Sequence, residues 1–250
     1  MTCLLILLIQ SCNDRPEPPQ PKKMDTSWTL LPAPNALDTV GTIFAVDSFG
    51  VLTRIPGGTL LLHISNNPIQ IAEQSKNKTV SWGAMASFLG TKGLINGADA
   101  SFNDSTTLEA TFKITNGQLS SFDDDLPKAF AKKSELIAHN VKFLKLEDQK
   151  LYLVLETIRS GDINISFDNT NDMKSNLSVD VEKLVKLNPH LSISLESKND
   201  LVYKLDYPLI VFYHLRPIDV NVISGKGGSQ EQVNISLGDT IQNQQVLEYR

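Results

Sequence analysis

The four histidines are the side chains best suited to proton transfer or metal binding: His63, His139, His190 and His214. No two of them lie within four residues of each other, and none belongs to an HExxH motif or to a cluster with metal-ligand spacing. His63 and His214 adjoin apolar strands, which favours structural histidines whose hydrogen bonds are satisfied. The sequence therefore predicts no metal site and no histidine-based catalytic site.

The other residue types that carry chemistry lack their usual neighbours. No Gly-x-Ser-x-Gly elbow is present, and the glycine-rich stretch 225–229 lacks the spacing of a phosphate-binding loop. Asp123, Asp124 and Asp125 lack the interleaved spacing of a calcium loop and are typical of a helix N-terminus. We find no catalytic residue and no implied cofactor. An enzyme whose site is assembled from distant residues, such as a carboxylate-based hydrolase, stays an open alternative.

Cysteine occurs only at Cys3 and Cys12, so residues 13–250 can form neither a disulfide bond nor a cysteine metal site. An apolar run, 4–9, precedes Gln10, Ser11 and Cys12. This arrangement resembles the lipobox of bacterial lipoproteins, with a short leader similar to those of Bacteroidota. The resemblance implies cleavage before Cys12 and acylation of its side chain. An uncleaved apolar N-terminus and an ordinary secretory leader are the alternatives.

The sequence after Cys12 supports a lipid anchor. Residues 12–27 hold four prolines and many charges, which is typical of an extended, solvated tether. We therefore divide the chain into a lipoprotein signal peptide (1–11), an acylated cysteine with its tether (12–27), and one folded domain (28–250). The expected location is a membrane, the outer membrane of the cell envelope, through the N-terminal lipid.

Composition limits the class of the folded domain and its partners. Apolar residues make up 41% of the 250 residues and charged residues 20%, as in an ordinary globular protein. The net charge is −5 and no basic patch stands out, so we expect no nucleic-acid partner. No apolar run reaches the 18 residues that suggest a membrane-spanning helix. The sequence points to no particular protein or small-molecule partner.

Long stretches of alternating apolar and polar residues are the most distinctive pattern. Residues 98–114 alternate over a length well beyond a typical strand, with an interruption at 103–105 that suggests a bulge. Alternation returns at 151–155 and 163–167. These segments predict long amphipathic strands.

Shorter patterns complete the prediction. Strands are expected at 42–46, 51–55, 59–64, 191–195, 201–205 and 209–215, with a hairpin turn at 199–200. Helical spacing marks 79–89, 123–146 and 179–187, with Asn140 as a candidate break. The expected fold is α+β and β-rich: a mainly antiparallel sheet with two or three packed helices.

The order of these elements suggests a second family. An amphipathic strand (98–114), an acidic-capped helix (123–146), the stretch Leu-Tyr-Leu-Val-Leu-Glu-Thr (151–157) and a later strand (201–207) follow one another. This order resembles the pore-forming domain of gasdermins, in which such hairpins become membrane-spanning strands. Two alternating segments, 98–115 and 151–167, each have at least the 9–11 residues that a membrane strand needs.

Two functional hypotheses follow. The first is a non-enzymatic, lipid-anchored protein of the cell envelope that acts by binding or as a structural component. The second is a gasdermin-like pore-forming protein. In the second hypothesis the lipid-facing residues would be Phe102, Leu108, Phe112, Ile114, Leu151, Leu153, Leu155, Ile163, Ile165 and Phe167.

Overall fold

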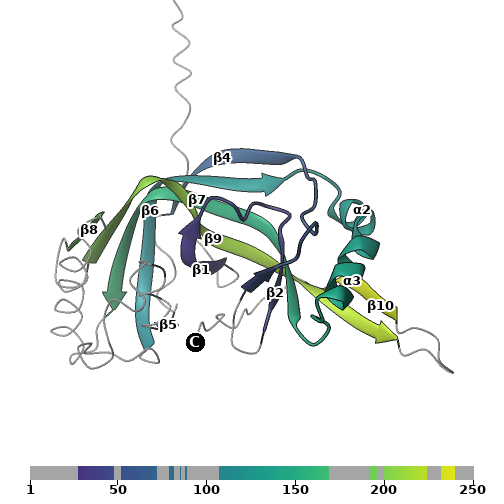
Figure 1. Cartoon of the computed structure of the whole chain (residues 1–250). Coiled ribbons are helices and arrows are strands. Elements are labelled where there is room, and N and C mark those ends of the chain that lie inside the picture. The colour runs from purple at the N-terminus through teal and green to yellow at the C-terminus, as the bar shows by residue number, and fades with distance from the viewer. Residues whose placement is uncertain are drawn as a thin grey trace, which may run out of the picture.

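Three long antiparallel strands form the centre of the protein in a computed structural model (Figure 1). They are β6 (Thr107–Phe122), β7 (Lys150–Asp168) and β9 (Asp200–Ile223), and β7 lies between the other two. The structure describes residues 28–47, 52–71, 79–81, 85, 88, 107–168, 192–195, 200–223 and 232–239.

Seven shorter strands extend this centre into one ten-stranded antiparallel sheet. They are β1 (Trp28–Asn35), β2 (Ile43–Val46), β3 (Leu52–Arg54), β4 (Ile64–Ile71), β5 (Thr79–Ser81), β8 (Ser192–Leu195) and β10 (Gln232–Leu237). β9 pairs along its outer edge with β8, then β1, then β10. β6 pairs on its outer edge with β5 and β4, and the start of β7 pairs with β2, which continues to β3. The expected α+β fold is thus present in a form dominated by its antiparallel sheet.

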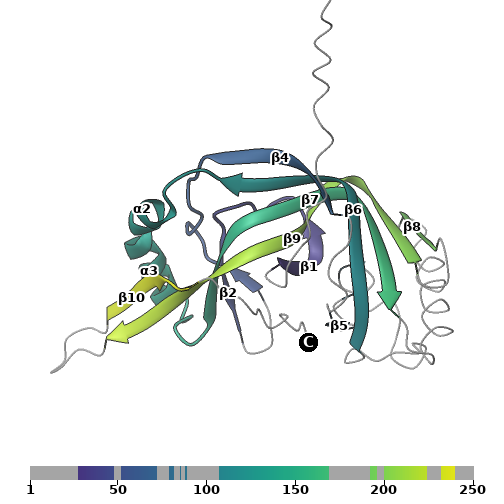
Figure 2. The ribbon, with the colours of Figure 1, turned by 180° about the vertical axis from the view of Figure 1, so that it is seen from behind.

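The β6–β7 and β7–β9 pairings differ in regularity. β6 and β7 keep one register from Glu109↔Asp168 to Ser120↔Thr157. The β7–β9 pairing shifts three times, after Val154, Ile158 and Ser160. At the last shift β9 has four unmatched residues, 205–208, against Gly161 of β7. Such extra residues bend a strand and increase its twist, and Figures 1 and 2 show the long strands curving over at their middle.

Two helices pack beside one end of the sheet: α2 (Leu126–Ala131) and α3 (Ser134–Phe143). The predicted single helix is wrong in detail, because the break falls at Lys132 and Lys133 and Asn140 lies inside α3. Asp125 is the N-cap of α2, and its side chain accepts a hydrogen bond from the Lys128 amide. The acidic run therefore begins a helix, as expected.

The C-terminus of α3 is closed by its own backbone. The Leu146 amide donates to the carbonyl of Val141 at 2.9 Å, and Lys145 adopts a positive φ of 56°. This pattern is a Schellman motif, in which the left-handed residue reverses the chain. Both Val141 and Leu146 are buried, so the motif also contributes an apolar contact.

The buried side chains form two main clusters at the two halves of the bent sheet. The helix-side cluster joins α2 and α3 to β2, the start of β7 and the β9–β10 hairpin. The wing cluster joins β1 and β4 to the halves of β6, β7 and β9 that lie away from the helices. A smaller third cluster includes Phe44, which stacks on Tyr213 with ring centroids 5.9 Å apart.

The remaining strand predictions have mixed outcomes. The β8–β9 hairpin is confirmed, with Leu195 opposite Leu201. The predicted strand 59–64 is wrong, because β4 begins at Ile64 and continues through Pro68 to Ile71. β1 and β10 were not expected, since prolines interrupt the first and the second is mostly polar. The helix predicted at 79–89 is wrong at its start, because Thr79–Ser81 form the strand β5. The predictions for 98–106 and 179–187 lie outside the described residues.

Candidate functional site

The candidate functional surface is the apolar face of the sheet in the wing, which is the half of the sheet that holds the wing cluster. Ala110, Phe112 and Ile114 of β6 are at most 1% exposed, whereas Lys113 between them is exposed. On β7, Ile163 and Ile165 are fully buried and Asn164 is not. Side chains alternate across a strand, so the buried residues share one face and the polar residues share the other. Residues 110–114 of β6 and 163–166 of β7 therefore form an amphipathic half of the β6–β7 ladder.

Four aromatic rings fill the centre of this face. Phe112 of β6 contacts Phe212 of β9 edge to face, with ring centroids 5.4 Å apart and planes at 89°. Phe88 lies edge-on to both Phe112, at 6.4 Å, and Tyr203, at 5.6 Å. Edge-to-face pairs of this kind add to the stabilisation that comes from burial alone. Phe88, with Trp28 of β1, therefore closes the apolar face against water.

Burial also affects the tyrosines of this region. It raises the pKa of Tyr203, because the charged phenolate would lose its hydration. Burial likewise raises the pKa of Tyr152 on β7. In both cases burial favours the neutral phenol; Tyr203 belongs to the wing cluster, whereas Tyr152 packs against the third cluster.

The predicted lipid-facing residues divide between the two main clusters. Phe112, Ile114, Ile163 and Ile165 belong to the wing cluster. Leu151, Leu153 and Leu155 instead pack in the helix-side cluster. The first register shift between β7 and β9 falls at Leu155 and the other two lie between these groups, so β7 does not present one continuous apolar face to one neighbour.

The other predicted residues are placed only by their strands or not at all. Leu108 lies in β6 opposite Val80, and Phe167 lies in β7 opposite Ala110. Phe102 and the lipidation candidate Cys12 lie outside the described residues. Phe88, Tyr203 and Phe212 were missing from the prediction. The alternation at 201–205 could have indicated Tyr203, whereas no local pattern would have placed Phe88 on β6.

A histidine–carboxylate pair is the nearest approach to a catalytic group. His214 of β9 lies 3.0 Å from Glu156 of β7, Nδ1 to Oε2, at a register shift between the two strands. The imidazole also packs against Trp28, with ring centroids 5.5 Å apart. This agrees with the expectation of a structural histidine. Among the described residues, no three histidine, cysteine or acidic side chains are grouped as metal ligands.

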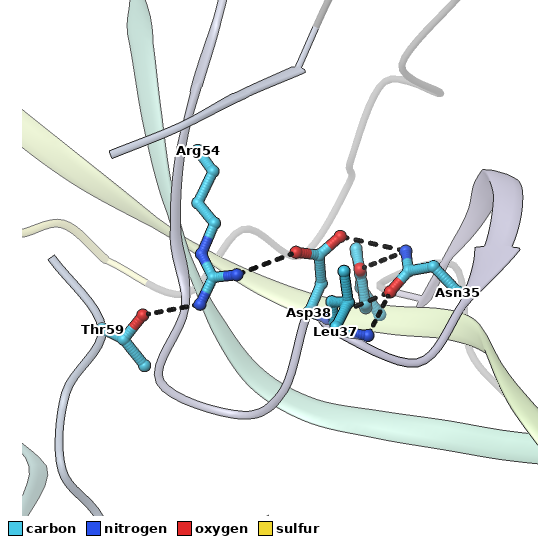
Figure 3. A network of polar contacts seen from close by, with 6 residues as sticks. Asn35, Leu37, Asp38, Arg54 and Thr59 are labelled. Atoms are coloured by element: carbon cyan, nitrogen blue, oxygen red, sulfur yellow. Dashed lines mark hydrogen bonds and ion pairs between the residues drawn. The ribbon is translucent and has the colours of Figure 1, made fainter. Parts of the chain in front are cut away.

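A second polar network connects the β1–β2 loop to neighbouring strands (Figure 3). Asn35 accepts hydrogen bonds from the amides of Leu37 and Asp38, and it donates to the Asp38 carboxylate at 2.9 Å. Arg54 lies 3.9 Å from Asp38 and donates to Thr59 at 3.2 Å. The carboxylate and guanidinium are thus engaged with each other and with the loop, so the network holds a turn in place.

A groove of about 450 Å³ separates α3 from β10. One wall consists of residues from Ser134 to Lys142 on α3, and the other of four consecutive residues from Gln232 to Ile235 on β10. None of the helices in the described part of the chain is long and apolar enough to cross a bilayer.

The chain is similar in shape to solved structures, whereas its sequence matches no known family. No protein-family model matches the chain, and no curated protein matches it. A bacterial gasdermin from Bradyrhizobium tropiciagri aligns in structure with a TM-score of 0.46 and 15% identity, over 85% of this chain and 86% of the other.

Proposed function

We propose that this protein inserts amphipathic β-strands into a lipid bilayer and makes it permeable. The observation that carries the proposal is the regular β6–β7 ladder. It runs from Glu109↔Asp168 to Ser120↔Thr157 in one register, which covers 12 residues of each strand. A membrane-spanning strand needs about 9–11 residues. The register is constant over this span, although the pairing is interrupted between Lys113↔Asn164 and Gly117↔Ser160. The paired segments are therefore long enough to cross a bilayer.

The two faces of the ladder support the same proposal. The backbone groups of a strand in lipid must all be bonded to neighbouring strands, and the constant register of β6 and β7 favours such bonding. Its apolar face, with Phe112 and Ile165, would contact acyl chains. Its polar face, with Lys113 and Asn164, would line a water-filled interior. In the folded protein the apolar face is occupied by the wing cluster, so insertion requires Phe88 to leave that face.

Dye release from vesicles tests the proposal. The full chain should release an entrapped dye, and the release should increase with the ratio of protein to lipid. Retention of the dye at every ratio, with protein shown to be bound to the vesicles, would reject membrane insertion.

Single labelled cysteines test which face meets lipid. In a background with Cys3 and Cys12 replaced by serine, an environment-sensitive dye is placed at residues 110, 111, 113 and 114 in separate variants. Nitroxide-bearing lipids should quench the dye at Ala110→Cys and Ile114→Cys, and much less at the matched controls Thr111→Cys and Lys113→Cys. Equal quenching at all four positions would contradict the predicted alternation.

A second candidate function is a non-enzymatic, lipid-anchored binding protein of the outer membrane. The leader and the proline-rich segment around Cys12 favour an anchor, because two or three acyl chains at about 0.8 kcal/mol per buried CH₂ would hold the protein at a membrane. Labelled palmitate should enter the wild-type chain and be absent from Cys12→Ser. Label that persists in Cys12→Ser and disappears in Cys3→Ser would move the anchor to Cys3. An anchored protein that never releases dye would favour this second function.

A further inference from the structure

The edges of the sheet differ in how well they are protected. In the described part of the chain β1, β3, β4, β5, β8 and β10 each pair with one strand only. β3 and β5 have three residues and β8 has four. β1 contains Pro32 and Pro34, and β4 contains Pro68. Short length and proline are two ways in which proteins prevent an edge from pairing with another chain.

β10 has none of these protections. Its sequence is Gln-Val-Asn-Ile-Ser-Leu, six residues without a proline or a charge. Its partner strand β9 adds two exposed apolar side chains opposite it, Val222 at 41% and Ile223 at 51%. An uncharged edge beside exposed apolar residues is a surface that favours strand addition.

The groove beside β10 exposes this edge. Four consecutive residues, Gln232 to Ile235, line it. Neighbouring side chains of a strand point to opposite faces, so a run of consecutive residues can line a groove only where the backbone edge faces it. Figures 1 and 2 show α3 and β10 lying next to each other at the end of the molecule away from the wing.

The opposite wall of the groove, on α3, is complementary to the same wall of a second copy of the chain. Its α3 residues are Ser134, Glu135, Ala138, His139 and Lys142. Glu135 and Lys142 stand near the two ends, with the small side chain of Ala138 between them. Seven residues of helix separate the two charges by roughly 10 Å. If the helix meets a second copy related by two-fold rotation, each Glu135 faces the Lys142 of the other copy.

We propose that the β10 edge and the groove-lining face of α3 form a two-fold interface with a second copy of this chain. The two β10 strands pair antiparallel, which continues the sheet from one copy into the other. Ser134 and Ala138 allow the two α3 helices to approach, and two Glu135–Lys142 pairs fix their alignment. A two-fold interface uses the same surface on both copies, as this arrangement requires. The interface lies outside the wing and does not depend on membrane insertion.

Charge reversal tests the interface without disturbing the core. The purified full chain should form a dimer in lipid-free buffer, measured by sedimentation velocity over a range of concentrations. Glu135→Lys and Lys142→Glu each replace two attractive pairs by two repulsive ones, and each should raise the dissociation constant about tenfold. An equimolar mixture of the two variants restores both attractive pairs, as does the double variant, and both should dimerise like the wild type.

The matched control is Lys128→Glu, an exposed lysine of α2 that does not line the groove, and it should leave the dissociation constant unchanged. A chain that stays monomeric at all concentrations would overturn the proposal. So would single variants that dimerise as well as the wild type, because the dimer would then use another surface. Failure of the mixture to recover the dimer would reject the two-fold pairing of Glu135 with Lys142.

Discussion

Phe88 lies edge-on to Phe112, with ring centroids 6.4 Å apart and planes at 82°, and both side chains are fully buried. Replacement of Phe88 by alanine should lower the free energy of unfolding by about 3–5 kcal/mol, because it removes a large core side chain and leaves a cavity. Urea unfolding measures the change.

The matched control for Phe88 is Phe143→Ala on α3. The Phe143 side chain is 76% exposed, so its removal should change stability by less than about 0.5 kcal/mol. Equal effects of the two substitutions would show that Phe88 does not support the wing. If the proposed function is correct, Phe88→Ala should also release dye from vesicles at a lower protein concentration than the wild type.

Lys145 offers a test of backbone strain. Its φ of 56° lies in the left-handed region, which costs a non-glycine residue roughly 1 kcal/mol. Lys145→Gly should therefore raise the free energy of unfolding by about 0.5–1 kcal/mol, measured by thermal or urea unfolding. Lys128→Gly, inside α2, should lower stability by a similar amount. A loss of stability in both variants would mean that the Lys145 side chain contributes more than its backbone costs.

Thr42 tests the cost of a buried hydroxyl group. Its side chain is fully buried, and its Oγ1 has no hydrogen-bond partner within the described part of the chain. Thr42→Val keeps the shape and removes the unsatisfied group, so it should stabilise the protein by about 1 kcal/mol. Thr59→Val is the control with the opposite expected sign, because the Thr59 hydroxyl accepts a hydrogen bond from Arg54. A destabilised Thr42→Val would indicate that the hydroxyl is satisfied in solution.

The buried tyrosines predict a loss of stability at alkaline pH. Burial raises the pKa of Tyr203 in the folded protein above its usual value of 10.0. The folded state therefore keeps its proton where the unfolded state releases it, so stability is level below pH 10 and falls as the pH rises above 10. Tyr152 contributes in the same direction.

Urea unfolding at a series of alkaline pH values measures this slope. Tyr203→Phe should make the decline shallower. Tyr207→Phe, at a side chain that is 63% exposed, should leave it unchanged. A decline that is the same in the wild type and in Tyr203→Phe would assign the alkaline loss to other groups.

Local sequence patterns predicted the positions of strands better than they predicted which of these strands are continuous with one another. The alternation at 151–155 and 163–167 predicted two strands, and both fall within the single strand β7. The pairing of β8 with β9 was correctly predicted, because the two strands are close in sequence, but Asp200 belongs to β9 and not to the turn expected at 199–200. The helix break was predicted at Asn140, whereas it lies at Lys132–Lys133. The Asn140 side chain donates to the Pro56 carbonyl at 2.7 Å, a contact from 84 residues away that the local sequence does not reveal.

Only part of the candidate functional surface was predicted, because local patterns do not reveal contacts between residues far apart in the sequence. Phe112, Ile114, Ile163 and Ile165 were recognised from their period of two, which follows from the geometry of any strand with one buried face. The sequence could not show that Leu151 and Leu153 pack under helices in a different cluster. The register shifts that separate the groups arise from how β7 meets β9, and neither strand alone contains that information.

The sequence by itself determined the class of the fold, the amphipathic character of the long strands, and the absence of a familiar catalytic motif. These features depend on residue type and short-range spacing. The tertiary structure alone decided that β6 and β7 pair in one register, that Phe88 covers their apolar face, and that β10, among the described residues, pairs with one strand only and lies beside α3. Pairing register and edge exposure depend on contacts between residues far apart in the chain, and the free energy of those contacts is set by the assembled sheet.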